Sequence, residues 1–169
     1  MTRASYAIAL GSNRPLSAQL PPRALLVAAM ATLGRPPLKL RATSSVIGSA
    51  PLGPSLRHYA NAAAIVETSL SPPALLLHLK ALERSFGRRN GQRWGARTLD
   101  LDIVLWSDGR WDGRALHVPH KAFRQRAFVL SPLASIAPLW RDPVTGLRIR
   151  HLLARAGRPK PVDRIGKPL

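Results

Sequence analysis

The sequence has no cysteine and very few acidic residues. Among its 169 residues are 8 Asp and Glu against 26 Lys and Arg, which gives a formal net charge of +18. The lack of cysteine excludes disulfides, cysteine-ligated zinc or iron–sulfur centres and a thiol nucleophile. The charge predicts an anionic partner, such as nucleic acid, an acidic membrane surface or a phosphorylated small molecule. Because acids are scarce, each carboxylate that is present needs an explanation.

Long apolar runs are also missing. The longest, residues 24–33, has ten residues, whereas a membrane-spanning helix needs ~20. The first apolar run, residues 6–10, is too short for the core of a secretion signal. We therefore expect no membrane segment and a cytoplasmic protein. The 46% hydrophobic content is that of a globular protein, and we expect one domain over residues 1–155, with 156–169 as a mobile basic tail.

Strand and helix signals alternate along the chain. Runs typical of strands lie at residues 6–10, 38–46, 60–68 and 98–106, with a hairpin return within 111–118. Helices are predicted at 23–33 and 74–86, and a final helix or a compact turn at 126–137. The alanines of 60–68 also permit a helix. The alternation favours a sheet layered with helices, of the α+β or α/β class, and periodicity alone does not choose between the two.

Residues 74–86 give the clearest helix signal. Ser71 is placed to cap its start, Pro72 and Pro73 suit its first turn, and Gly87 suits a C-terminal cap. One apolar stripe runs along it, made of Leu75, Leu76, Leu79, Leu82 and Phe86.

Two of the eight acids lie together in the predicted strand 98–106. Alternation directs Leu99, Leu101, Ile103 and Leu105 to the core and leaves Asp100 and Asp102 on the other face. Alpha carbons two residues apart on a strand are ~6.5–7 Å apart, so both carboxylates can reach one hard cation or a pair of them. Mg²⁺ favours one or two protein carboxylates with water and phosphate oxygens. The alternative is a solvated outer face of an amphipathic strand.

An acid-free basic stretch precedes this strand and contains Arg84, Arg88, Arg89, Arg93 and Arg97. A guanidinium binds phosphate oxygens with two parallel hydrogen bonds and keeps its charge. An exposed basic turn or an RNA contact remains an alternative. The chain contains no Gly-x-x-x-x-Gly-Lys-Ser/Thr motif, which excludes a Walker-type nucleotide site.

Two further clusters are candidates for chemistry. His120 follows Val118-Pro119 and precedes Arg124 and Arg126; a histidine in such a loop is either a packed residue or a catalytic one. Alternation puts Tyr59 and Asn61 on one strand face, an aromatic ring beside an amide. That pair suits a flat heterocycle, and a tyrosine packed in the core is the alternative.

Several short segments, in a fixed order from Tyr6 to about Pro138, carry a resemblance to a known family. They are Ala9-Leu10-Gly11-Ser12-Asn13, Ala50-Pro51-Leu52-Gly53-Pro54, Tyr59-Ala60-Asn61, Glu83, Gly87-Arg88, Arg93-Trp94-Gly95-x-Arg97-Thr98-Leu99-Asp100-Leu101-Asp102, Val118-Pro119-His120 and Arg126-Ala127-Phe128-Val129-Leu130-x-Pro132-Leu133. The chain thereby resembles the 6-hydroxymethyl-7,8-dihydropterin pyrophosphokinases of folate biosynthesis.

The resemblance implies a ferredoxin-like α+β sandwich, with a mainly antiparallel sheet and helices on both faces. It implies an ATP-dependent pyrophosphokinase of EC class 2.7.6, which transfers a pyrophosphoryl group from ATP to the pterin hydroxymethyl oxygen and releases AMP. The implied cofactor is Mg²⁺, two ions, and the implied partners are ATP and the pterin. We expect a monomer that binds nucleic acid only through non-specific electrostatics.

The resemblance also assigns residues to roles. Asp100 and Asp102 would hold the two Mg²⁺ ions. Catalytic contacts are implied for Arg88, Arg97, Asp100, Asp102, His120 and Arg126. The implied ATP site comprises Glu83, Arg88, Arg89, Trp94, Arg97, Ile103, His120 and Arg126, and the implied pterin site comprises Ser49, Ala50, Leu52, Tyr59, Asn61, Asp100 and Phe128.

The chain departs from the family pattern at a few positions. Ala96 stands where a proline is usual, the basic loop after Gly87 is a residue short, and Leu56 replaces a frequent glutamine. Ala115 and His117 replace an Arg/Thr pattern. The short loop leaves open whether Arg88 or Arg89 takes a given phosphate. Two other functions therefore stay open, a small basic nucleic-acid-binding protein and a degenerate family member that binds pterin or ATP.

Overall fold

The computed structural model describes residues 3–49, 58–87 and 98–157. Its main strands are β1 (Ala4–Ser12), β2 (Lys39–Thr43), β3 (Ile47–Ser49), β4 (Tyr59–Thr68) and β5 (Asp100–Trp106). Its helices are α1 (Pro22–Thr32), α2 (Pro72–Ser85), α3 (Ala127–Ile136) and α4 (Ile149–Ala156). Shorter elements are β6 (Trp111–Asp112), β7 (His117–Val118) and the 3₁₀ turn η1 (Phe123–Gln125).

The main sheet has the strand order β2-β4-β1-β5, and β3 also pairs with β4. Every pairing in it is antiparallel. The succession strand, helix, two strands, helix, strand with this order is the ferredoxin-like arrangement. The α+β class that the resemblance implied is therefore confirmed. Strands β6 and β7 pair only with each other, as a separate small ribbon.

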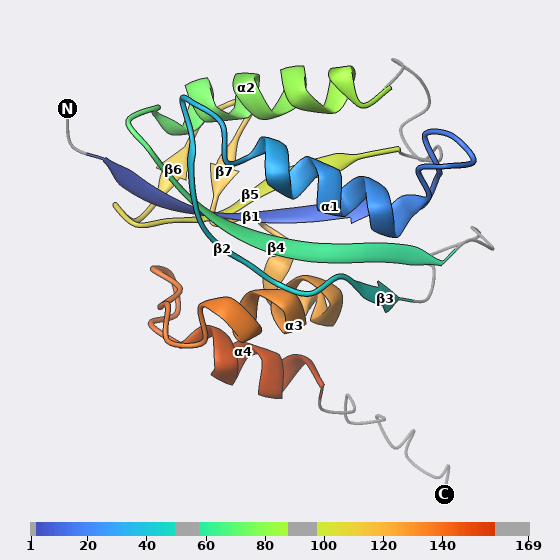
Figure 1. Cartoon of the computed structure of the whole chain (residues 1–169). Helices are drawn as coiled ribbons and strands as arrows, with labels where there is room; N and C mark the ends of the chain where they lie inside the picture. Colours follow the sequence, from blue (N-terminus) through green and yellow to red (C-terminus); the bar gives the residue numbers. More distant parts are fainter. Residues whose placement is uncertain (1–2, 50–57, 88–97, 158–169) are drawn as a thin grey trace, which may run out of the picture.

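Helices cover both faces of the sheet, as expected. Figure 1 shows α1 and α2 on one face and α3 and α4 on the opposite one. Two hydrophobic clusters match these layers. The α1/α2 layer packs on Tyr6, Ile8 and Leu10 of β1, and the α3/α4 layer packs on Ala7 of the same strand. Because successive side chains of a strand point to opposite faces, each strand contributes residues alternately to the two cores.

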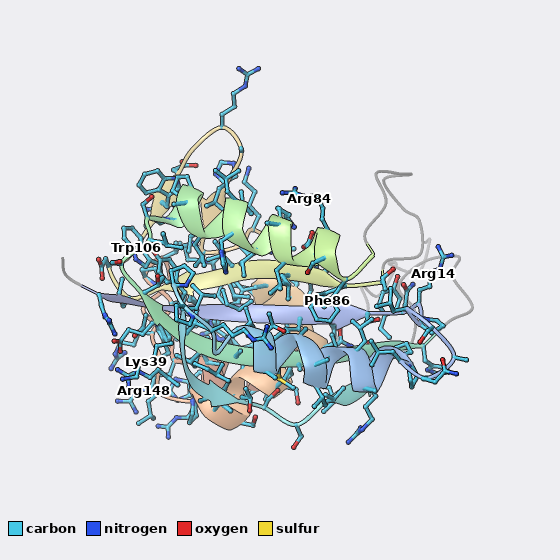
Figure 2. All side chains as sticks on the ribbon, turned by 45° about the horizontal axis from the view of Figure 1, so that its top comes forward. Arg14, Lys39, Arg84, Phe86, Trp106 and Arg148 are labelled. Atoms are coloured by element: carbon cyan, nitrogen blue, oxygen red, sulfur yellow. The ribbon has the colours of Figure 1, made fainter. Side chains whose placement is uncertain are left out.

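Most charged side chains lie outside these two cores, and the buried carboxylates of Glu83 and Asp142 are exceptions. In Figure 2, Arg14 and Arg84 extend away from the ribbon, whereas Phe86 lies over the core beside α1. Phe86 packs on the α1/α2 cluster, together with Leu76 and Leu82 of the predicted stripe. Leu75 and Leu79 of that stripe are fully buried.

Both ends of α2 were expected to have caps, and one of them does. Gly87 follows the helix with φ +78°, and a side chain at this position would collide with Leu16. Ser71 occupies the N-cap position but its side chain makes no capping hydrogen bond. Prolines at the first two helical positions explain this, because one of the N–H groups that a cap would bind is missing.

The strand predicted over 38–46 was wrong as a single element, because it forms β2 and β3 with a break between them. The Ser44 hydroxyl causes the break: it accepts the Ala63 N–H at 2.9 Å in place of a backbone carbonyl. A β-bulge next to Ala7 and Ile8 also corrects the prediction for Leu105. Leu105 is fully buried but belongs to the α3/α4 cluster and not to that of Leu101 and Ile103.

The C-terminal part holds a helix that the sequence reading did not place. Helix α4 packs Ile149 and Leu152 against the α3 layer, so α3 is not the last helix. The predicted tail began at residue 156, where α4 ends, and residues 158–169 lie outside the described part. Within the described residues, no helix is long and apolar enough to cross a membrane.

Candidate active site

The two strand aspartates lie on the sheet face that α3 covers, above the smallest side chains of β1. Asp100 pairs in register with Gly11, and Asp102 pairs with Ala9. On the far side of β1, Gly11 is opposite Asn61 of β4. Both aspartates are half-buried, and Leu101 between them is fully buried in the other core. Small residues on β1 therefore leave room between the carboxylates and the Asn61 amide.

The electrostatics of this pair favour a bound cation. Burial, and next the charge of Asp100, raise the pKa of Asp102 above its ordinary value, while His120, Lys80 and Arg126 oppose the rise. Two carboxylates that repel each other in a half-buried place form a cation site that one or two hard ions would relieve. Among the described residues no group of three or more His, Cys, Asp or Glu gathers as a metal site, so the candidate donor set is the two carboxylates, a number that suits Mg²⁺.

His120 and Arg126 approach the aspartates from the loop between β7 and α3. The His120 N–H donates to the Val104 carbonyl of β5 at 3.0 Å, which ties the loop to the strand. Burial lowers the pKa of His120, and Asp102 partly opposes this shift. Arg126 occupies the N-cap position of α3, and its guanidinium carbon lies 5.9 Å from the centre of the Phe128 ring. The loop thus brings a histidine, a guanidinium and an aromatic ring toward one region.

Tyr59, Asn61 and Ser49 form the neighbouring part of the same region. Ser49 is opposite Tyr59 in the β3–β4 pairing, and the Asn61 amide nitrogen donates to the Ser49 hydroxyl at 2.8 Å. Asn61 is 5% exposed, and Tyr59 is half-buried. The tyrosine is therefore not a core residue, and the amide beside it is held in a fixed orientation.

Glu83 has a contact that sequence reasoning did not anticipate. Its carboxylate oxygen Oε1 accepts the Leu101 N–H of β5 at 2.8 Å and the Lys80 ammonium at 2.7 Å. Lys80 also donates to the Leu101 carbonyl at 3.5 Å. The Glu83 side chain is fully buried. The pair therefore holds the outer edge of β5 at the residue between the two aspartates, and the available signal was the spacing of three between Lys80 and Glu83.

The remaining residues assigned by the resemblance divide into two groups. Ile103 is 2% exposed and its side chain belongs to the α1/α2 core, so this side chain is not available to a ligand. Six residues lie outside the described part of the chain, namely Ala50, Leu52, Arg88, Arg89, Trp94 and Arg97.

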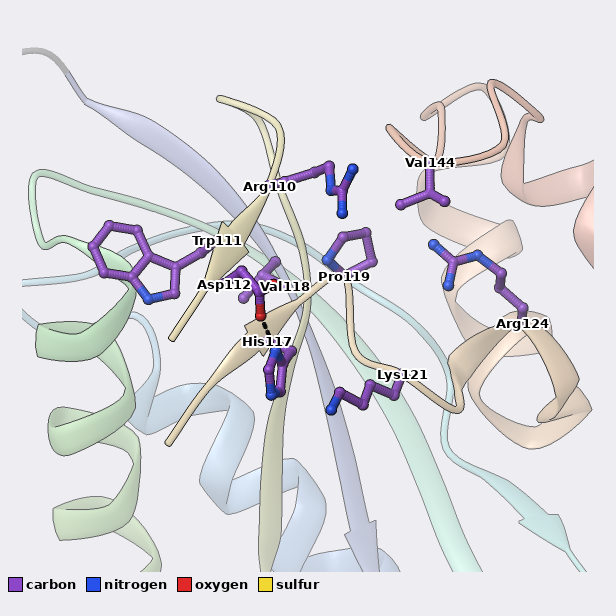
Figure 3. A pocket seen from close by; sticks show the side chains of 9 residues that line it. All are labelled: Arg110, Trp111, Asp112, His117, Val118, Pro119, Lys121, Arg124 and Val144. Carbon is purple, nitrogen blue, oxygen red and sulfur yellow. Dashed lines mark hydrogen bonds and ion pairs between the residues drawn. The ribbon is translucent and has the colours of Figure 1, made fainter. Parts of the chain in front are cut away.

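A pocket of about 250 Å³ lies beside this region, at the β6–β7 ribbon. Figure 3 shows Arg110, Arg124 and Val144 around one side of Pro119, and His117 and Lys121 on the other. The His117 ring forms a hydrogen bond with the Asp112 carboxylate across the ribbon. The two aspartates of β5 do not line the pocket. Sequence reasoning did not single out Arg110, Trp111, Asp112, Lys121 and Val144, because their positions follow from how the ribbon folds.

Comparisons with known proteins agree on one family. A model of the 7,8-dihydro-6-hydroxymethylpterin-pyrophosphokinase (HPPK) family matches residues 7–138. Several curated relatives carry the name 2-amino-4-hydroxy-6-hydroxymethyldihydropteridine pyrophosphokinase, and three of them are compared with this chain. The one from Pseudomonas aeruginosa is 42% identical over 149 residues, 87% of this chain and 88% of that protein. The one from Methylorubrum extorquens is 34% identical over 98% of this chain and 99% of that protein.

The third relative and the solved structures are longer than the matched part. The Synechocystis relative is 41% identical over 69% of this chain and 60% of that protein. A crystal structure of Plasmodium falciparum HPPK-DHPS with pteroate matches 91% of this chain and 42% of its own, with a TM-score of 0.69 and 14% identity. At that identity the likeness concerns the fold alone.

Proposed function

The chain belongs to the 7,8-dihydro-6-hydroxymethylpterin-pyrophosphokinase family, and we infer from this membership that it is a pyrophosphokinase of folate biosynthesis. It transfers a pyrophosphoryl group from ATP to the hydroxymethyl group of 6-hydroxymethyl-7,8-dihydropterin. The observation that carries the inference is the family match over residues 7–138, which includes both aspartates of β5.

The reaction makes one bond and breaks one. The pterin hydroxymethyl oxygen attacks the β-phosphorus of ATP, its proton is released, and the bond from that phosphorus to the oxygen bridging the α-phosphate breaks. AMP leaves with the bridging oxygen. Such a transfer needs in-line positioning and neutralisation of charge more than covalent help. We therefore propose no protein nucleophile and no covalent intermediate.

The aspartates are proposed to hold Mg²⁺. Asp100 and Asp102 suit it because they share one face beside small residues of β1, and because burial, and next the charge of Asp100, raise the pKa of Asp102. Bound Mg²⁺, two ions in this proposal, would neutralise triphosphate oxygens and orient the attacking and leaving groups.

His120 and Arg126 are proposed to contact the triphosphate, because both act electrostatically on Asp102 from the loop before α3. Arg88, Arg89 and Arg97 are proposed to take the remaining phosphate charge, with Trp94 and Glu83 around the nucleotide. These roles rest on the resemblance.

The pterin is proposed to lie between Tyr59 and Phe128, with Asn61 at its edge. The half-buried tyrosine, the amide fixed by Ser49 and the ring at the start of α3 support this assignment. Ala50, Leu52 and the Asp100 carboxylate complete the proposed pterin site. We further propose a cytoplasmic monomer with one catalytic domain.

The test is to incubate the protein with ATP and Mg²⁺, with and without the pterin, and to measure the AMP formed by chromatography. AMP that appears only with pterin is the expected result. If folded protein forms no AMP but binds pterin or an ATP analogue, the chain is a degenerate family member and not an active pyrophosphokinase.

The charge of +18 favours a second candidate, a nucleic-acid-binding protein. It predicts RNA affinity that falls steeply with salt and does not depend on either aspartate. Binding that is tight at physiological salt and unchanged in Asp102→Ala, without AMP formation, would favour this candidate.

A further inference from the structure

A buried ion pair joins the turn before α3 to the hairpin before α4. Arg124 donates from Nε to Asp142 Oδ2 and from Nη2 to Asp142 Oδ1, each at 2.7 Å. The Asp142 side chain is fully buried, and Arg124 retains 25% exposure. Two parallel charge-assisted hydrogen bonds fix both groups in distance and in orientation. Asp142 is the only acid in residues 113–157, so the single carboxylate of this segment is used on the turn.

Asp142 is held firmly on its own side. The Thr145 hydroxyl donates to Oδ2 at 2.5 Å, and the Val144 N–H donates to Oδ1 at 3.2 Å. Burial works to raise the pKa of Asp142, but the hydrogen bonds from Arg124 and Thr145 outweigh it and lower the pKa below its ordinary value. The Asp142 N–H also donates to the Leu147 carbonyl at 2.9 Å. The carboxylate is therefore charged and rigidly mounted.

The η1 turn, which contains Arg124, is held in place by backbone hydrogen bonds and by a buried side chain. Arg124 lies in η1, between His120 and Arg126. The Phe123 N–H donates to the His120 carbonyl at 3.2 Å, and the Arg126 N–H donates to the Phe123 carbonyl at 3.1 Å. Phe123 is fully buried, and the Arg124 guanidinium lies 4.8 Å from the centre of its ring. A displacement of Arg124 would therefore also displace His120 and Arg126, which lie at the two ends of the turn.

We propose that Arg124 and Asp142 are positioning residues, whose ion pair sets where His120 and Arg126 stand relative to the aspartates of β5. The proposal rests on the proposed function, in which these two residues contact the triphosphate. Neither Arg124 nor Asp142 lies in the segments that carry the family resemblance. The pterin side is anchored separately, because α3 buries Val129, Leu130 and Leu133 in the core below Phe128.

The test compares nucleotide and pterin binding in Asp142→Asn, Arg124→Lys and the milder Thr145→Val. Asp108→Asn and Arg150→Lys are exposed controls that change the same groups elsewhere. Calorimetry measures the Kd of an unreactive ATP analogue with Mg²⁺ and, separately, of the pterin, and kinetics gives kcat and KM. We expect the analogue Kd and the KM for ATP to rise about tenfold in the first two variants and about threefold in Thr145→Val. The pterin Kd should change less than about twofold.

Two results would overturn the positioning role. One is a folded Asp142→Asn protein whose analogue Kd and kcat stay within about twofold of the wild type; the other is an equal loss of pterin and nucleotide binding. If Asp142→Asn does not fold, the same criteria apply to Thr145→Val. Hydrogen exchange separates this proposal from the function itself. The Arg126 amide should exchange faster in Asp142→Asn even if the wild type forms no AMP, and unchanged exchange there would also contradict the proposal.

Discussion

The two faces of the central strands differ in what they pack. Toward α1 and α2, β1 and β5 present large side chains such as Tyr6, Ile8 and Leu101, which are all fully buried. Toward α3, the same strands present Gly11, Ala9 and the two half-buried aspartates. The face toward α1 and α2, here called the filled face, packs large side chains along these strands. The face toward α3, here called the shallow face, has small and charged side chains at residues 9–11 and 100–102, beside the hydrophobic cluster that α3 and α4 cover. A single alternation of side chains therefore lets β1 and β5 contribute to a core on one face and to the candidate site on the other.

Removing a carboxylate from the shallow face should have the largest effect on activity. In Asp100→Ala and Asp102→Ala we expect the rate of AMP formation to fall at least about a thousandfold, because the proposed Mg²⁺ loses a ligand. The melting temperature should not fall, because each aspartate repels the other. The exposed Asp108→Ala is the control. Full activity in both variants would refute the metal assignment.

A cavity on the filled face should lower the stability of the protein and leave its catalytic rate unchanged. Ile8→Ala removes a fully buried side chain, and we expect it to lower the free energy of unfolding by about 2–5 kcal/mol. Denaturant titration measures this loss, and kcat per folded molecule should stay near the wild-type value. Val27→Ala, at a position that is 55% exposed, is the control and should cost less than about 0.5 kcal/mol. A large fall in kcat with stability intact would contradict the division between the faces.

One methyl group on the shallow face sharpens the comparison. A Cβ at Gly11 would lie 3.9 Å from Asn61 Oδ1, an ordinary contact that the fold should tolerate. We expect Gly11→Ala to raise the KM for the pterin about tenfold, because the methyl enters the space between the amide and the carboxylates. Gly157→Ala, at the end of α4, is the control. An unchanged KM for the pterin in Gly11→Ala would mean that the pterin does not occupy the space between the Asn61 amide and the carboxylates.

The smallest expected effect concerns the Tyr6 hydroxyl, which donates to the Leu70 carbonyl at 2.7 Å. Burial, with a smaller effect of Asp108, raises the pKa of Tyr6 to about 12, against ~10 when unfolded. The folded state therefore holds this proton more tightly, and the resulting stability is complete below pH ~10 and is lost as the pH rises toward 12. Tyr6→Phe should cost about 1 kcal/mol at neutral pH.

Denaturant titrations from pH 8 to 12 check this prediction. The wild type and Tyr6→Phe should converge as the pH rises, because only the wild type loses the contribution of the hydroxyl. A constant difference between them across the whole range would show that Tyr6 does not titrate with folding.

Local patterns were sufficient to predict most of the elements and the aspartate pair. The spacing of two between Asp100 and Asp102 predicts a shared face for any strand, and the proline and glycine signals around 72–87 predict the ends of α2. Two errors arise where a partner intervenes. A bulge turns Leu105 to the other core, and the Ser44 hydroxyl interrupts the second strand.

Contacts between distant residues could not be predicted in this way. Arg124 and Asp142 are separated by 18 residues, and nothing in either neighbourhood marks them as partners. Glu83 presents the same difficulty, since its link to Leu101 depends on α2 lying along β5. Helix α4 did carry a signal, apolar residues at 149, 152 and 153, but it spans only eight residues in an arginine-rich context.

In the part of the chain that the structure describes, β5 forms one edge of the main sheet, and this has a consequence for how the protein meets others. An unpaired strand edge usually invites another strand to add to the sheet. Here the Leu101 N–H is taken by Glu83, the Leu101 carbonyl by Lys80 and the Val104 carbonyl by the N–H of His120. At the opposite edge, β2 is short and bulged, and it contains the exposed charged residues Lys39 and Arg41. The sheet therefore resists growth into a fibre or a strand-exchanged pair, and the groups that block its β5 edge are those that hold the candidate site in place.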